Sequence, residues 1–107
     1  DDHTKNISFL MDKTGTWKLS PAYDMSWAYN PKGEWTSHHQ MSINKKWDNI
    51  TRADLIAVAE AMHIKKADSI INETCDAVSM WTTIAKELDI PSNMIVKIDD
   101  TLLYRNY

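Results

Sequence analysis

The sequence contains few glycines: Gly15 and Gly33 are the only two in 107 residues. The chain therefore cannot build G-x-G-x-x-G or G-x-x-x-x-G-K-S, the glycine-rich loops that cradle phosphates. Its single cysteine, Cys75, cannot form an internal disulfide, so we expect a reduced, cytoplasmic setting. No apolar run approaches the ~20 residues of a membrane-spanning helix. The formal net charge of −3 argues against direct nucleic-acid binding, which requires a basic face.

What is present is typical of a globular protein, with 43% hydrophobic and 25% charged residues. The length allows one domain, which we expect over residues 1–107. The patterning predicts a mainly α fold with an N-terminal β-hairpin. Residues 1–24 would form a polar loop and the hairpin, residues 25–50 a loop segment, and residues 51–107 a helical region.

The hairpin is predicted over residues 7–19, because two β-like runs flank a glycine-containing turn at residues 12–15. The two-residue period of a strand places Ile7, Phe9 and Met11 on one face. We expect this face to pack into the core. A hairpin also brings its two ends together, so residues before and after it should meet in space.

Three polar residues flank the hairpin at a spacing that suits phosphoryl transfer. In protein kinases a catalytic-loop Asp accepts the proton of the substrate hydroxyl, and an Asn five residues later holds Mg²⁺. Asp1 and Asn6 have that spacing. Asp24 lies where the metal-binding Asp of a D-F-G motif would lie, although Met25-Ser26 replaces Phe-Gly. Mg²⁺ prefers carboxylate and amide oxygens and usually takes only one or two protein ligands.

Three ordered motifs extend this pattern over the first half of the chain. They are D-D-H-T-K-N at residues 1–6, S-P-A-Y-D at residues 20–24 and H-Q-M-S-I-N at residues 39–44. Together they closely resemble the HipA-type serine/threonine kinases, bacterial toxins of toxin–antitoxin pairs. Where the family often has glycine after the last Asn, this chain has Lys45, which leaves the geometry of that turn open.

The resemblance implies part of the C-lobe of a kinase-like fold that transfers the γ-phosphoryl of ATP to a protein hydroxyl. Asp1 would be the catalytic base, and Asn6 and Asp24 would hold Mg²⁺. Lys5 would either steady the transferred phosphoryl group or pair with Asp2.

The resemblance also bears on what the chain lacks. It has neither a glycine-rich loop nor a recognisable strand-borne Lys with a helical Glu partner. We therefore expect the C-terminal piece of a kinase whose N-terminal, ATP-binding lobe is missing. We also expect the 107-residue chain alone to have no kinase activity.

Two alternatives stay open at this point. Asp1, Asp2 and His3 could belong to a metal-dependent phosphoesterase, with further ligands from His38 and His39. In a second alternative, the helices from residue 51 onward form an interaction module for an antitoxin-like protein, and the acidic loop is incidental.

The helical region contains three predicted helices. The first begins at Thr51, a capping residue followed three positions later by Asp54, and runs to about His63. The second spans residues 66–88 and the third residues 92–104. The third is predicted to turn five apolar side chains inward: Met94, Ile95, Ile98, Leu102 and Leu103.

Overall fold

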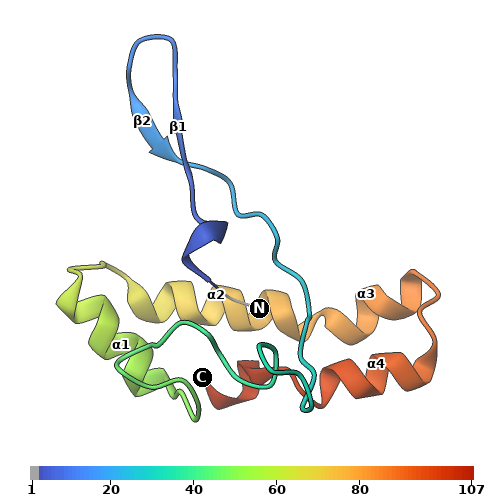
Figure 1. Ribbon diagram of the computed structural model, residues 1–107. Coiled ribbons are helices and arrows are strands. Elements are labelled where there is room, and N and C mark those ends of the chain that lie inside the picture. Colours follow the sequence, from blue (N-terminus) through green and yellow to red (C-terminus); the bar gives the residue numbers. More distant parts are fainter. Residues whose placement is uncertain (1–2) are drawn as a thin grey trace. The chain divides into compact units, whose positions relative to one another are not determined.

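The computed structural model describes residues 3–107, which form two compact units divided between Ser42 and Ile43. The first unit contains a β-hairpin and the second a set of helices (Figure 1). The predicted class, mainly α with an N-terminal β-hairpin, is confirmed. A single domain over residues 1–107 stays a prediction. No helix within the described residues is long and apolar enough to cross a membrane.

The first unit contains one 3₁₀ turn and two antiparallel strands: η1 (Thr4–Asn6), β1 (Phe9–Met11) and β2 (Trp17–Leu19). Phe9 lies opposite Leu19 in the register. The pairing continues past the strand ends, because the N–H of Ser20 donates to the carbonyl of Ser8 at 2.9 Å. The hairpin predicted over residues 7–19 is confirmed.

Asp12 organises the hairpin turn. Its carboxylate accepts hydrogen bonds from the N–H and the hydroxyl of Thr14 at 2.8 and 2.6 Å, and from the N–H of Thr16 at 3.0 Å. Gly15 takes φ +85°, and its N–H donates to the Asp12 carbonyl at 3.1 Å, which gives a type I turn followed by a left-handed residue. These donors, the Thr14 hydroxyl foremost, hold the pKa of Asp12 below its ordinary value.

The expectation that the hairpin packs into the core is wrong. Ile7, Phe9 and Met11 are all exposed, as is every residue of both strands. Apart from η1 and the two strands, residues 3–42 contain no helix or strand. The first unit therefore has no second layer to bury an apolar face of the hairpin.

The loop predicted over residues 25–50 is confirmed, since no helix or strand forms between β2 and the first α-helix. Short turns order it locally. The N–H of Gly33 donates to the carbonyl of Asn30 at 2.9 Å, and Ile43 and Lys46 form an isolated antiparallel bridge.

Helix α1 (Arg52–Ala61) begins where the sequence predicts it. The carboxylate of Asp54 accepts hydrogen bonds from the N–H and the hydroxyl of Thr51, at 2.9 and 2.8 Å. Thr51 is thereby fixed as the N-cap. His63 takes φ +56°, the left-handed conformation common just past helix ends.

The single helix predicted over residues 66–88 is wrong, because two helices occupy this range: α2 (Ala67–Ser79) and α3 (Trp81–Glu87). The hydroxyl of Ser79 donates to the carbonyl of Asp76 at 2.7 Å. That carbonyl would otherwise accept the N–H of Met80, which donates to Ala77 at 3.3 Å instead. A side chain that competes for the backbone ladder in this way favours a break in the helix.

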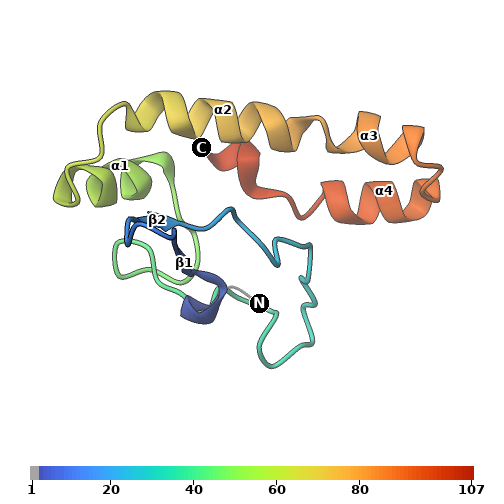
Figure 2. The same ribbon diagram turned by 90° about the horizontal axis from the view of Figure 1, so that it is seen from above.

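The core of the second unit lies where α3 packs against α4 (Ser92–Asp99). Ala85, Ile95 and Ile98 are buried there, and the indole N–H of Trp81 donates to the Ile95 carbonyl at 3.2 Å. Figure 2 shows α1 beside α2, and α3 beside α4.

The third predicted helix is too long. It ends at Asp99, and a 3₁₀ turn, η2 (Leu103–Asn106), follows. The N–H and the hydroxyl of Thr101 both donate to the Ile98 carbonyl, at 2.9 and 2.7 Å, which tightens the last turn and ends the α-helix. Met94 and Leu103, predicted to face inward, are exposed.

Candidate functional site

The base of the hairpin brings two predicted site residues together. The amide Nδ2 of Asn6 donates to Oδ2 of Asp24 at 3.0 Å, although 18 residues separate them. Asn6 ends η1 just before β1, and Asp24 follows β2 after Pro21. The prediction that the hairpin joins Asn6 and Asp24 is confirmed. Their roles as Mg²⁺ ligands stay predictions.

Asp24 adopts φ +56°, a left-handed conformation that non-glycine residues rarely take but that Asp tolerates better than most. Its side chain is exposed, and Asn6 is half-buried. An exposed carboxylate in contact with a side-chain amide is open to a ligand from solvent. A backbone in an uncommon conformation is also a frequent property of functional positions.

Two further contacts hold the ends of the hairpin in place. The hydroxyl of Tyr23 donates to the backbone carbonyl of Lys5 at 2.9 Å. The hydroxyl of Ser8 donates to that of Ser20 at 3.0 Å. The distance between Asn6 and Asp24 is therefore fixed by strand pairing and by side-chain ties on either side.

Of the other predicted catalytic residues, the structure describes Lys5 but not Asp1. Asp1, the predicted base, and Asp2 lie outside the described residues. Lys5 lies within η1 and is exposed; its suggested role at the phosphoryl group stays a prediction. The His3 carbonyl accepts the N–H of Asn6 at 3.1 Å, which positions the loop next to the Asn6–Asp24 pair.

The third motif, H-Q-M-S-I-N, ends in a tight turn. Asn44 and Lys45 take φ +49° and +62°, and Ile43 and Lys46 exchange two backbone hydrogen bonds of 2.9 Å across them. Two left-handed central residues define the type I′ turn that Asn-Gly usually forms. The turn whose geometry the sequence left open is therefore a type I′ turn, with Lys45 where glycine is usual.

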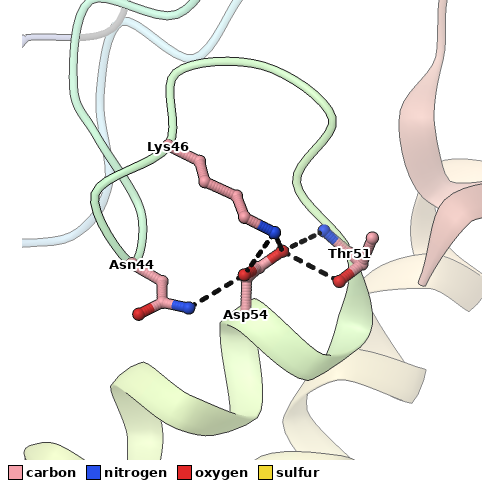
Figure 3. A network of polar contacts seen from close by, with 4 residues as sticks. All are labelled: Asn44, Lys46, Thr51 and Asp54. Atoms are coloured by element: carbon pink, nitrogen blue, oxygen red, sulfur yellow. Dashed lines mark hydrogen bonds and ion pairs between the residues drawn. The ribbon is translucent and has the colours of Figure 1, made fainter.

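This turn is joined to helix α1 by the side chain of Asp54 (Figure 3). Asn44 Nδ2 donates to Oδ1 of Asp54 at 2.9 Å, and Lys46 Nζ lies 2.8 and 2.9 Å from its two oxygens. With the two hydrogen bonds from Thr51, the buried carboxylate is surrounded by donors. Asn44, the last residue of the motif, therefore has a structural contact here.

The donors around Asp54 favour its ionised form. The ammonium group of Lys46 is the largest cause, followed by the amide of Asn44, and together with Thr51 they hold the pKa of Asp54 well below its ordinary value. A buried charge without these partners would be costly. Asp54 thus joins the turn, the cap and the first helix of the second unit in one polar cluster.

A metal site at Asn6 and Asp24 fits the chemistry of the donors present. Both side chains carry oxygen, and the Asn6 amide can turn its oxygen, in place of its N–H, toward the carboxylate. Two protein ligands are the usual number for Mg²⁺ in phosphate-binding sites. Within residues 3–107 no group of three His, Cys, Asp or Glu side chains could hold a metal ion. The phosphoesterase alternative also draws on Asp1 and Asp2, which lie outside the described residues, so it stays a prediction.

Sequence reasoning missed two residues that shape these sites. Tyr23 was noted only as part of a motif, yet its hydroxyl ties Lys5 to the far side of the hairpin. Asp54 was predicted as a helix-dipole partner, yet it also holds the 43–46 turn. The T-x-x-D spacing signalled the cap. Nothing in the spacing signalled a bond to a residue ten positions earlier.

Comparison with models of known protein families found a match. The family model described as "HipA-like C-terminal domain" matches residues 1–82, which include the hairpin, the loop segment and helices α1 and α2. No curated protein and no solved structure matches the chain.

Proposed function

Because the chain belongs to the HipA-like C-terminal domain family, we propose that it is part of the C-lobe of an ATP-dependent protein serine/threonine kinase. Its contribution would be the catalytic loop and the residues that hold magnesium. The observation that carries this proposal is the contact between Asn6 and Asp24 at the base of the hairpin. The first two motifs of the sequence supply both residues.

Each residue has a role in this proposal. Asp1 accepts the proton of a protein Ser or Thr hydroxyl. Asn6 and Asp24 offer oxygen ligands, and Lys5 presents a positive charge to the phosphoryl group. When bound, Mg²⁺ neutralises charge on the phosphates of ATP. A separate N-terminal lobe would bind the nucleotide. Phosphoryl transfer would take place in the cytoplasm.

A direct test uses Mn²⁺ as a paramagnetic stand-in for Mg²⁺, with the 107-residue chain labelled for NMR. We expect Mn²⁺ to broaden the side-chain amide signals of Asn6 and the backbone signals around Asp24, and excess Mg²⁺ to reverse the effect. The variant Asp24→Asn removes the charged ligand and should abolish this broadening. Asp48→Asn alters an exposed carboxylate in the other unit and should leave it unchanged.

Broadening that persists at Asn6 in Asp24→Asn would contradict the metal assignment. Activity is tested in a protein that joins this chain to a nucleotide-binding lobe. There Asp24→Ala should lower phosphoryl transfer by orders of magnitude, with the melting temperature nearly unchanged, because the side chain is exposed. Wild-type turnover in that variant would refute the kinase role of Asp24.

A second candidate function rests on helix α2, in which no residue is buried. On this helix Ile70 is half exposed, whereas Ile71, Cys75 and Val78 are partly covered. An exposed apolar side chain such as Ile70 can contact a partner helix. On this view an antitoxin-like protein would bind the second unit. Binding that survives Asp24→Asn, in a chain that does not respond to Mn²⁺, would favour this candidate over the kinase.

A further inference from the structure

The peptide unit between Lys5 and Asn6 is held at both of its polar atoms. The hydroxyl of Tyr23 donates to the Lys5 carbonyl at 2.9 Å, and the N–H of Asn6 donates to the His3 carbonyl at 3.1 Å. Because a peptide unit is planar, hydrogen bonds at its two opposite edges fix its orientation. The direction in which the Asn6 side chain leaves the backbone depends on that orientation.

Two side-chain hydrogen bonds join the segment before the hairpin to the segment after it. One is the bond between Tyr23 and Lys5, and the other is the bond between Asn6 and Asp24. The backbone ladder does not reach these residues: within the part of the chain that the structure describes, no backbone hydrogen bond joins the two segments. Closure of the site therefore depends on these two side-chain contacts.

The two contacts differ in what metal binding would do to them. The bond from Asn6 to Asp24 uses the very groups that the proposed function assigns to magnesium. It is lost when Asn6 turns its amide oxygen, in place of its N–H, toward the metal. The bond between Tyr23 and Lys5 uses neither group, since it joins a phenol hydroxyl to a main-chain carbonyl. It can therefore persist while the metal is bound.

We propose that Tyr23 is a positioning residue for the magnesium site, an inference that rests on the proposed function. Its hydroxyl holds the peptide before Asn6 close to Asp24 after the direct bond between the two ligands is lost. Tyr23 directly precedes Asp24, and Lys5 directly precedes Asn6, so this contact lies one residue from each ligand. Ligands that are held in place in this way lose less freedom when the metal binds.

The test is a titration of the 107-residue chain with Mn²⁺, followed by the broadening of the Asn6 side-chain amide signals. Tyr23→Phe removes only the hydroxyl, and should weaken Mn²⁺ binding by about threefold or more, the effect of one hydrogen bond. Tyr29→Phe is the matched control and should keep the wild-type affinity. Tyr29 is equally exposed, at 43%, in the same unit, and no hydrogen bond joins its hydroxyl to a described residue.

A second control separates positioning of the ligands from general closure of the hairpin. Ser8→Ala removes the 3.0 Å bond between the hydroxyls of Ser8 and Ser20. The backbone bond between the same two residues remains, so the strands stay paired. Mn²⁺ should therefore bind Ser8→Ala as tightly as it binds the wild-type chain.

A further measurement asks whether the bond between Tyr23 and Lys5 persists with the metal bound. On addition of Mg²⁺, which is diamagnetic, the side-chain amide signals of Asn6 should move while the ¹³C signal of the Lys5 carbonyl stays near its metal-free position. In Tyr23→Phe that carbonyl signal should be displaced even without metal, because the hydrogen bond is absent.

The outcomes distinguish this inference from the proposed function. A wild-type chain that does not respond to Mn²⁺ overturns both. A wild-type response that Asp24→Asn abolishes, together with unchanged affinity in Tyr23→Phe, overturns the positioning role alone. A loss of affinity in Ser8→Ala or Tyr29→Phe as large as that in Tyr23→Phe does the same. So does a Lys5 carbonyl signal that Mg²⁺ moves to its position in Tyr23→Phe.

Discussion

At the residue scale, Lys45 carries a conformation that its side chain disfavours. Its φ of +62° belongs to the left-handed region, which costs an L-residue roughly 1–2 kcal/mol, whereas glycine adopts it freely. The flanking bridge between Ile43 and Lys46, and the anchoring of Asn44 by Asp54, hold the turn closed nonetheless. The strain is thus offset by contacts that the neighbours of Lys45 make.

Lys45→Gly should therefore stabilise the second unit by about 0.5–1 kcal/mol, even though glycine adds freedom to the unfolded chain. Chemical denaturation followed by circular dichroism measures this. Lys65→Gly is the matched control: Lys65 is an exposed lysine outside the left-handed region, so glycine there should destabilise. A loss of stability in Lys45→Gly would show that its left-handed backbone carries no strain that glycine relieves.

Sequence reasoning succeeded at residues linked by local rules. The contact of Asn6 with Asp24 follows from hairpin closure, and the capping by Thr51 follows from its spacing to Asp54. Sequence reasoning did not predict the hydrogen bond between Asn44 and Asp54, because that bond depends on the path of the loop between residue 44 and helix α1. The periodicity of apolar residues does not predict the path of a loop.

At the element scale, the sequence predicts where the helices begin better than where they are interrupted or end. The apolar pattern continues past Met80 into the residues of α3. The sequence therefore predicts one helix where the structure has two. One hydroxyl favours the break: Ser79 donates to the Asp76 carbonyl, which would otherwise accept the next N–H of the helix. The α4 helix ends similarly, at a Thr101 bond that the apolar pattern does not register.

Ser79→Ala should restore much of the continuity between α2 and α3. Without the hydroxyl, the Asp76 carbonyl is free to accept the N–H of Met80, and alanine adds about 0.5 kcal/mol of helix propensity. Cα chemical shifts at residues 79–81 should move toward helical values. Ser69→Ala, an exposed site within α2, should leave those shifts unchanged. If the break persists, the packing of α3 on α4 sets it instead.

At the scale of the whole molecule, the described residues of each unit include one Asp with a lowered pKa: Asp12 in the first and Asp54 in the second. Asp12 in the hairpin turn is exposed, so water screens its interactions and little stability depends on its charge. Asp54 is buried and pairs with Lys46. Acid should therefore affect the two units unequally, with the larger loss in the second.

The sign follows from the direction of the shift. A carboxyl whose folded pKa is depressed adds stability that is fully present above its unfolded pKa, here the ordinary value of 3.8. That stability declines as the pH falls below about 4, and continues to decline toward the lower folded pKa. We expect the melting temperature of the second unit to fall steadily over this range.

Asp54→Asn should lower that melting temperature by several degrees at neutral pH and remove much of its decline in acid. The neutral amide cannot form an ion pair with Lys46. It also has only one acceptor oxygen, whereas the carboxylate offers two to the same donors. Thermal melts between neutral pH and pH 2, followed by the amide signals of residues 43–61, measure both effects. Asp48→Asn should keep the wild-type acid profile, because Asp48 is exposed. An unchanged profile in Asp54→Asn would mean that other carboxyls govern the acid response, and that the turn does not depend on the charge of Asp54.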